Sequence, residues 1–301
     1  MTNTDLIKQL RALTQAGMKD CREALEEAQG DLQKAVDIVK IKGLNIADGR
    51  TGLAATDGRI AIANDDGTAV MVEVNTATDF TANNDIVIDF VEKVADGLYE
   101  TAIANQEFDV DTFEDDRKGV VALIKENVVI RRWAVEQSME PSVRVFSYLH
   151  TNNKIGVVMS MKAPSVRQTQ AKEFIELGND LTMQIAAMNP LAVSPDRISP
   201  DDLARQKAIF ETQLKEEGKP PAMWDKIMIG KLKKYFQEVC LLDQASIIKP
   251  KLTIKNVIDD IATRLRGSIL ISNFVRYQVG NGIPKPESSF KEEVIKLITD
   301  V

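Results

Sequence analysis

The chain has 301 residues, of which 44% are hydrophobic and 28% are charged. This is the composition of a folded protein with more than one hydrophobic core, and it excludes a wholly disordered chain. The formal net charge of -7 argues against broad electrostatic capture of nucleic acid, so a protein partner is favoured.

The cysteines and the N-terminus bear on location and cofactors. Cys21 and Cys240 lie far apart without a CxxC spacing, so neither a disulfide framework nor a structural zinc site is supported. The chain passes directly into an amphipathic pattern, with no signal peptide, transit segment or long apolar span. We therefore expect a cytoplasmic protein without a membrane anchor or a bound cofactor.

The N-terminal part of the chain predicts three short helices. Apolar residues recur at helical spacing until Gly17, and Asp20 with Glu23 is typical of a capping box that starts a second helix. Gly30 and Gly43 are expected to end the second and third helices. A unit of this size has a marginal core, so we predict a small docking module that packs against something else.

A linker and a first α+β unit are expected next. Residues 49–58 are rich in Gly, Ala, Thr and Asp and show no periodicity, which is typical of a linker. Alternation and helical spacing then predict a β-hairpin, two helices and an extended run. In chain order these are strands at 60–62 and 70–74, helices at 86–98 and 120–125, and the extended run at 128–133.

The order of hairpin and helix then recurs, which suggests two related subdomains. The second hairpin is predicted at 143–148 and 155–161, and its helix at 168–189. Two strongly helical segments, separated by Gly218-Lys219-Pro220-Pro221, predict an antiparallel helical hairpin that projects from the body. The remaining predicted elements are the two helices of that hairpin at 201–217 and 223–242, a helix at 253–266, a strand at 269–279 and a terminal helix at 289–298.

Several sequence blocks, in order along the chain, resemble the elongation factor Ts family. The block at 73–82, Glu-Val-Asn-Thr-Ala-Thr-Asp-Phe-Thr-Ala, is the most specific, because it resembles the family's Thr-Asp-Phe-Val motif directly after a strand. The other blocks are 10–25, which resembles the family's N-terminal signature, and 130–132, 148–157, 185–190 and 274–283. The resemblance thus covers nearly the whole chain.

The fold class follows from these elements together with the resemblance. We predict an α+β protein with an N-terminal three-helix UBA-like module, an antiparallel core of two subdomains, a projecting antiparallel helical hairpin and a C-terminal helix. The expected boundaries are 1–50 for the docking module, 51–140 and 141–280 for the two subdomains, about 195–242 for the inserted hairpin and 281–301 for the C-terminal module.

The resemblance implies a guanine nucleotide exchange factor that binds elongation factor Tu in its GDP-bound and nucleotide-free states. It implies that Thr78, Asp79, Phe80 and Thr81 enter the partner's nucleotide domain and disturb its magnesium site, with the Phe wedging between helices. Taken without the resemblance, Asp79 could simply cap a turn and Phe80 could cover the local core.

The resemblance also implies a set of partner-binding residues, and each has a plainer alternative. The residues on the first two helices could simply belong to the solvated and core faces of those helices. The histidine could be a turn residue, and the two isoleucines could belong to a core strand. The set comprises Arg11, Met18, Lys19, Arg22, His150, Ile247 and Ile248.

The chain departs from the family pattern at several positions. Thr81 stands where the family usually has Val, Lys19 where a second Met is common, and Gln184 where His is usual. Gln244-Ala245-Ser246 replaces a common Gln-Pro-Phe. These changes bear on the strength of individual contacts and leave the Asp79-Phe80 pair in place.

Absent motifs argue against an enzyme. The sequence contains no GxxxxGK[ST] loop, no GxGxxG after a strand and no HExxH, so it shows no means of holding a nucleotide or metal itself. The lysine-rich stretch 231–235 is more typical of a solvated helix face than of an RNA site. Two functions stay open: an exchange factor, and a scaffold bound to elongation factor Tu, as in an RNA-phage replicase.

Overall fold

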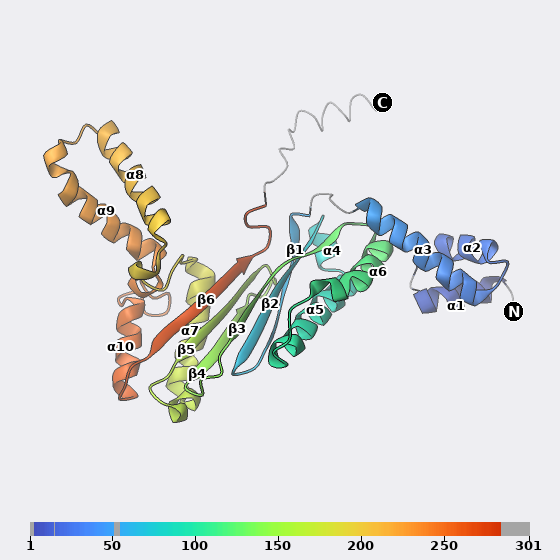
Figure 1. The fold of residues 1–301 in the computed structure, drawn as a ribbon, viewed down its shortest axis with the longest axis horizontal. Helices are drawn as coiled ribbons and strands as arrows, with labels where there is room; N and C mark the ends of the chain where they lie inside the picture. Colours follow the sequence, from blue (N-terminus) through green and yellow to red (C-terminus); the bar gives the residue numbers. More distant parts are fainter. Residues whose placement is uncertain (1–2, 15, 51–54, 284–301) are drawn as a thin grey trace.

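The computed structural model describes residues 3–14, 16–50 and 55–283, and Figure 1 shows an elongated molecule with helices at both ends and strands between them. The C-terminal helix predicted at 289–298 lies outside the described residues. Helices and antiparallel strands confirm the α+β class. Among the described residues, none of the helices is both long and apolar enough to cross a membrane.

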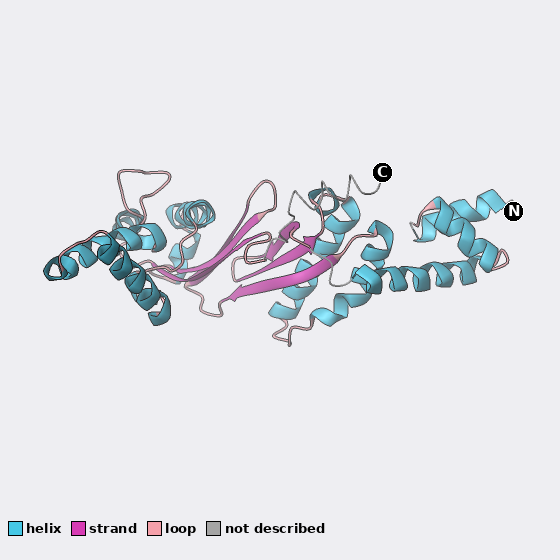
Figure 2. Cartoon of the chain, turned by 90° about the horizontal axis from the view of Figure 1, so that it is seen from above, coloured by secondary structure: helices cyan, strands magenta, loops and turns pink. Residues whose placement is uncertain are grey.

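The described strands form two three-stranded antiparallel sheets, in the orders β1-β2-β3 and β4-β5-β6 (Figures 1 and 2). Both predicted hairpins are confirmed, and each gains a third strand from further along the chain. The strands are β1 (Asp57–Asn64), β2 (Thr68–Thr76), β3 (Val128–Gln137), β4 (Val143–Leu149), β5 (Ile155–Lys162) and β6 (Leu270–Gln278).

The two sheets pack face to face, and the alternation of side chains along the strands explains why. In β2, Val70 and Val72 belong to the core beneath the helices, whereas Met71 lies between the sheets in a cluster that includes Val158 of β5. Every residue of β2 is buried, because both faces of this central strand are covered. At Gly156 a Cβ atom would lie 2.7 Å from the Met71 sulfur, so the sheets approach too closely there for a side chain.

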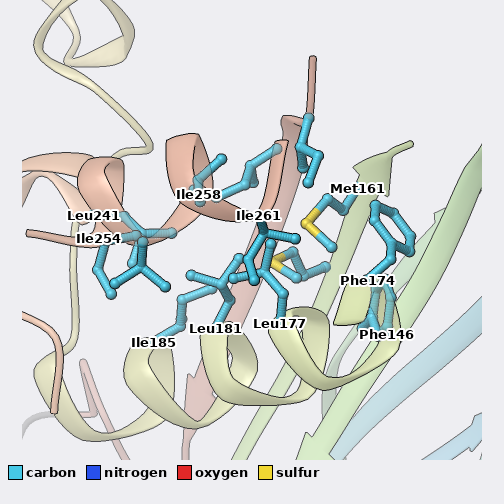
Figure 3. Close-up of a cluster of buried hydrophobic side chains, with 14 of the residues drawn as sticks. Phe146, Met161, Phe174, Leu177, Leu181, Ile185, Leu241, Ile254, Ile258 and Ile261 are labelled. Carbon is cyan, nitrogen blue, oxygen red and sulfur yellow. The ribbon is translucent and has the colours of Figure 1, made fainter. Parts of the chain in front are cut away.

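Helices cover the outer face of each sheet. The first sheet packs against α5 (Asp85–Ile103) and α6 (Glu114–Ile124). The helix α7 (Lys172–Met188) packs on the second sheet, and α10 (Ile254–Arg264) packs against α7. Figure 3 shows this second core, in which apolar side chains from α7 and α10 meet those of the sheet.

The N-terminal residues form the three predicted helices, α1 (Asn3–Thr14), α2 (Met18–Glu27) and α3 (Leu32–Arg50). They enclose a small core of their own that includes Leu10 and Leu25, and α3 also packs against α6. The UBA-like assignment and the domain boundaries stay predictions.

Several helix boundaries differ from the prediction, among them the start of α2 and the end of α3. Glu23 and Asp20 do not cap α2, which begins at Met18; the Asp20 carboxylate instead pairs with Lys125 beyond α6, at 3.1 Å. The helix α3 continues through Gly43 to Arg50, so the linker predicted from residue 49 begins later. Packing of α3 against α6 offsets the ~1 kcal/mol that a glycine costs inside a helix.

The projecting hairpin is confirmed. It consists of α8 (Pro200–Glu216) and α9 (Trp224–Val239), which extend from the body in Figure 1. Its base is held by an apolar cluster that includes Ala192, Ile198 and Cys240.

The helix α7, predicted from residue 168, begins at Lys172 after a 3₁₀ turn, in which the Gln168 amide donates to the Leu265 carbonyl.

Candidate functional site

The segment after β2 forms a short helix, α4 (Asp79–Ala82), which we call the Phe80 tip. Thr78 caps this helix: its side-chain oxygen accepts from the Thr81 N–H at 3.3 Å, and its hydroxyl donates to Glu126 at 3.1 Å. Oδ1 of Asp79 accepts from the Phe80 N–H at 3.0 Å. The sequence placed this motif directly after a strand, and the structure shows that it forms a capped helical turn there.

Exposure divides the Phe80 tip into two sides. Phe80 is 85% exposed, whereas its neighbour Thr81 is only 5% exposed. The alternative in which Phe80 covers the local core is therefore wrong. A large aromatic side chain that an ordered turn holds out into solvent is available for contact with a partner.

His150 begins the turn between β4 and β5, which we call the His150 turn (residues 150–154). Its side chain is exposed, and its Nδ1 lies 2.9 Å from the Tyr148 hydroxyl. The turn closes through the Asn153 N–H, which donates to the His150 carbonyl at 2.7 Å. Asn153 adopts a left-handed φ of 55°, a conformation that asparagine tolerates.

The start of β1 lies between the Phe80 tip and the His150 turn and contacts both. The Arg59 guanidinium donates to the side chain of Asn83, directly after α4, at 3.4 Å. On the other side the Ile60 N–H donates to the Asn153 carbonyl at 2.8 Å, and Lys154 pairs with Asp57. The structure thus brings Phe80 and His150, which the sequence separates widely, to the same end of the sheets.

Comparison with known proteins bears directly on this arrangement. Residues 77–281 match the family model described as Elongation factor TS. The chain is 36% identical over 302 residues to elongation factor Ts of Brucella anthropi, covering 97% of each chain. It is 35% identical over 305 residues to elongation factor Ts of Clostridium botulinum, covering 98% of this chain and 99% of that one. The chain belongs to the elongation factor Ts family.

The N-terminal candidates of this elongation factor Ts family member lie on α1 and α2, away from the Phe80 tip along the molecule (Figure 1). Arg11 is exposed, and Met18 is 50% exposed. Lys19 pairs with Glu23 at 3.9 Å, and Arg22 makes a similar surface pair with Glu26 at 4.0 Å. Exposed pairs of this kind contribute little to stability, so these cations can exchange partners at low cost.

Ile247 and Ile248 lie in the segment between α9 and α10, at 42% and 49% exposure. The alternative of a core strand is therefore wrong. Gln184, which is buried, accepts from the Ile247 N–H at 2.9 Å and donates to the Ala245 carbonyl at 3.1 Å. The glutamine that replaces the family's usual histidine thus holds this segment in place.

Two informative residues escaped the sequence analysis. Leu13, an apolar residue of α1, is 66% exposed and borders a groove of 470 Å³ between the N-terminal helices and α6. Glu73 is fully buried in β2. The signal for Glu73 was a single charge within the otherwise uncharged strand at residues 68–76, which favours a buried ion pair.

Proposed function

We propose that this protein is a guanine nucleotide exchange factor that binds elongation factor Tu in its GDP-bound and nucleotide-free states. Membership of the elongation factor Ts family supports the partner. The exposure of Phe80 on an ordered turn carries the mechanism, because it supplies a rigid apolar wedge. We place its action in the cytoplasm.

The proposed mechanism is distortion of the partner's magnesium and phosphate site. Magnesium requires nearly ideal octahedral coordination, so a small displacement of its ligands weakens nucleotide binding steeply. Burying the exposed Phe80 ring in the partner would contribute ~1.5–3 kcal/mol to hold that distorted state. The capped turn gives this ring a defined direction.

The coupling between exchange factor and nucleotide is reciprocal. If the bound factor weakens GDP binding, GDP must weaken binding of the factor by the same ratio. Exchange is then accelerated while the final equilibrium of GDP between solution and partner is unchanged. The chain needs no nucleotide site of its own, which agrees with the absence of a phosphate-binding loop from its sequence.

A scaffold function is the second candidate. The exposed residues on α1, α2 and the segment before α10 lie outside the Phe80 tip, and they could hold elongation factor Tu in a larger complex without affecting its nucleotide. The two functions separate at Asp79 and Phe80, which only an exchange factor requires.

The direct test mixes the purified chain with elongation factor Tu that carries fluorescent GDP. An exchange factor increases the rate of GDP release with its own concentration until the rate saturates. Stopped-flow fluorescence measures that rate, and sedimentation of the mixture measures complex formation. A stable complex that releases GDP no faster than the partner alone would favour the scaffold.

A further inference from the structure

The buried carboxylate of Glu73 lies between the two sheets and accepts three hydrogen bonds. Its Oε1 accepts from Arg131 Nη1 at 2.8 Å and from the Gly280 N–H at 2.9 Å, and its Oε2 accepts from Arg132 Nε at 2.6 Å. Charge-assisted bonds of this kind are among the strongest in proteins. The carboxylate is fully buried, while the two arginine side chains are 22% and 30% exposed.

A β-bulge allows two consecutive arginines to reach one carboxylate. Neighbouring residues of a strand normally point to opposite faces of the sheet. Here Glu73 pairs with Arg132 while Val74 pairs with Ile130, so Arg131 is an extra residue in β3. Bulges re-aim side chains in this way, and both guanidinium groups therefore meet Glu73.

The same arginines hold the end of β6 and the chain that follows it. Arg131 Nη2 donates to the Asn281 carbonyl at 2.6 Å, and Arg132 Nη2 donates to the Gln278 carbonyl at 3.1 Å. The Arg132 guanidinium also lies 4.1 Å from the centre of the Tyr277 ring. Three charged residues of the first sheet thus hold residues 277–281, which are the end of β6 and the chain directly after it. We call this assembly the Glu73 clasp.

The Glu73 clasp also connects to the His150 turn. The Val279 N–H donates to the Lys154 carbonyl at 2.9 Å. Gly280 has a left-handed φ of 75°, and a Cβ atom there would lie only 2.4 Å from the Thr56 carbonyl oxygen. The backbone after β6 is therefore enclosed between the His150 turn and the residue before β1.

We propose that Glu73 is a positioning residue for GDP release: the clasp fixes the Phe80 tip relative to the His150 turn. Glu73 lies on β2, whose last residue, Thr76, leads directly into the tip. The Phe80 ring can hold the partner in a distorted state only if the turn that carries the ring keeps its position. A loosened tip would still make its contacts in the bound state, but it would hold the distorted partner less firmly.

The protein contains a matched control for ordinary packing between the sheets. Glu136 of β3 is also buried, and it accepts from Ser160 at 2.6 Å and from Asn273 at 2.8 Å. These partners lie on β5 and β6, further from the His150 turn. Glu136 thus joins the same two sheets without holding residues 277–281.

The first test compares three variants in GDP release, and it rests on the proposed exchange function. Each of the variants Glu73→Gln and Arg131→Met weakens hydrogen bonds to a charged group in the clasp. The free energy of one such bond corresponds to a factor of about ten in an equilibrium or rate constant, so we expect each variant to slow maximal GDP release about tenfold. The concentration at half-saturation should change little, because the docking residues are untouched. Glu136→Gln should leave the maximal rate near that of the unmodified chain. Equal slowing by Glu136→Gln and Glu73→Gln would overturn the proposal.

A second measurement needs no partner, so it separates failure of the clasp from failure of the exchange function. Spin labels at Asp85→Cys, beside the Phe80 tip, and Thr151→Cys, in the His150 turn, report their separation by pulsed electron resonance. Both positions are exposed, and both native cysteines are buried. We expect a narrow distance distribution that Glu73→Gln broadens and Glu136→Gln does not. An unchanged distribution in Glu73→Gln would overturn the clasp whatever the exchange assay shows.

Gly280→Ala provides a variant that keeps every charge. The added methyl group conflicts with the Thr56 carbonyl and with the positive φ, so it should broaden the same distribution and slow maximal release. If Glu73→Gln fails to fold by circular dichroism, Gly280→Ala and Arg131→Met decide the question. A folded Gly280→Ala chain with an unmodified distribution and rate would count against the clasp.

Discussion

At the scale of single residues, the Phe80 tip combines exposure with order. Phe80 presents its ring to solvent while the adjacent Thr81 is buried against the body, and Thr78 caps the turn that separates them. Because the ring is exposed, it contributes little to the folding free energy of the free protein. The favourable free energy of burying the ring is gained only when a partner covers it.

Phe80→Ala should therefore slow GDP release from elongation factor Tu while leaving the chain folded. If burial of the ring contributes ~1.5–3 kcal/mol to the distorted state, its loss slows exchange roughly ten- to a hundredfold. Stopped-flow release of labelled GDP measures the effect, with circular dichroism as the folding control. Met139→Ala is a matched control, because Met139 is another exposed apolar side chain, at 79%, outside the candidate site. A folded Phe80→Ala chain that exchanges at the unmodified rate would refute the wedge.

Asp79→Ala should act in the same direction as Phe80→Ala. The Asp79 carboxylate accepts from the Phe80 N–H at 3.0 Å, so both residues serve one insertion and their effects should be less than additive. The double variant in the same release assay tests this expectation. Fully additive losses would indicate that the two side chains act on separate features of the partner.

The sequence predicted the site residues Phe80 and His150, but it did not predict the contacts that position them. The resemblance singled out both Phe80 and His150. That the two lie at one end depends on contacts of the β1 start with Asn83 and Asn153, which no local pattern encodes. Arg131 could not be paired with Glu73 beforehand, because strand alternation excludes two neighbouring arginines on one face unless a bulge intervenes.

At the scale of elements, the periodicity of apolar residues predicted whether a segment is a helix or a strand. The residues at which the helices begin and end depended on tertiary contacts. The α8–α9 hairpin was predicted because its two helical segments flank a break at 218–221. The end of α3 was missed at Gly43 because packing on α6 outweighs the cost of the glycine. Asp20, which was predicted to cap α2, likewise forms an ion pair with Lys125, next to α6.

The base of the α8–α9 hairpin offers a test of how firmly it is closed. Cys240 is fully buried there, and burial raises its pKa from 9.0 to about 11. A raised pKa means less thiolate at any pH below it, so at pH 8 the reactive form is reduced about a hundredfold relative to an unperturbed thiol. In a Cys21→Ala chain, Cys240 should react with an aromatic disulfide reagent only after denaturation. Rapid stoichiometric reaction of the folded chain would show that the hairpin base opens readily.

At the scale of the whole molecule, the candidate contacts occupy separate regions along an elongated body (Figures 1 and 2). The N-terminal helices lie beyond α6, the Phe80 tip and the His150 turn lie at one end of the sheets, and Ile247 and Ile248 lie near the base of the projecting hairpin. Such spacing would let one partner be bound at several points. It also separates docking from the wedge, because no single element carries both.

Removal of residues before about Gly52 should therefore weaken partner binding and leave the rest of the chain folded. The N-terminal helices have a core of their own, around Leu10 and Leu25, that includes no residue of the sheets. Among the described residues, their contact with the body includes packing between α3 and α6 and the exposed Lys125–Asp20 pair, and an exposed pair contributes at most ~1 kcal/mol. The inter-sheet cluster and the Glu73 clasp stay complete without them.

This truncation should have the opposite kinetic signature to Phe80→Ala. The truncation removes the proposed docking residues Arg11, Met18, Lys19 and Arg22, whose contacts we expect to be equal before and after GDP release. The half-saturating concentration should therefore rise, while maximal release at saturation stays close to that of the full chain. Titrated stopped-flow release measures both quantities, and circular dichroism checks folding. A truncated chain that does not fold would place the module within the main core, and one with a lowered maximal rate but unchanged half-saturation would assign the N-terminal helices to the distortion step itself.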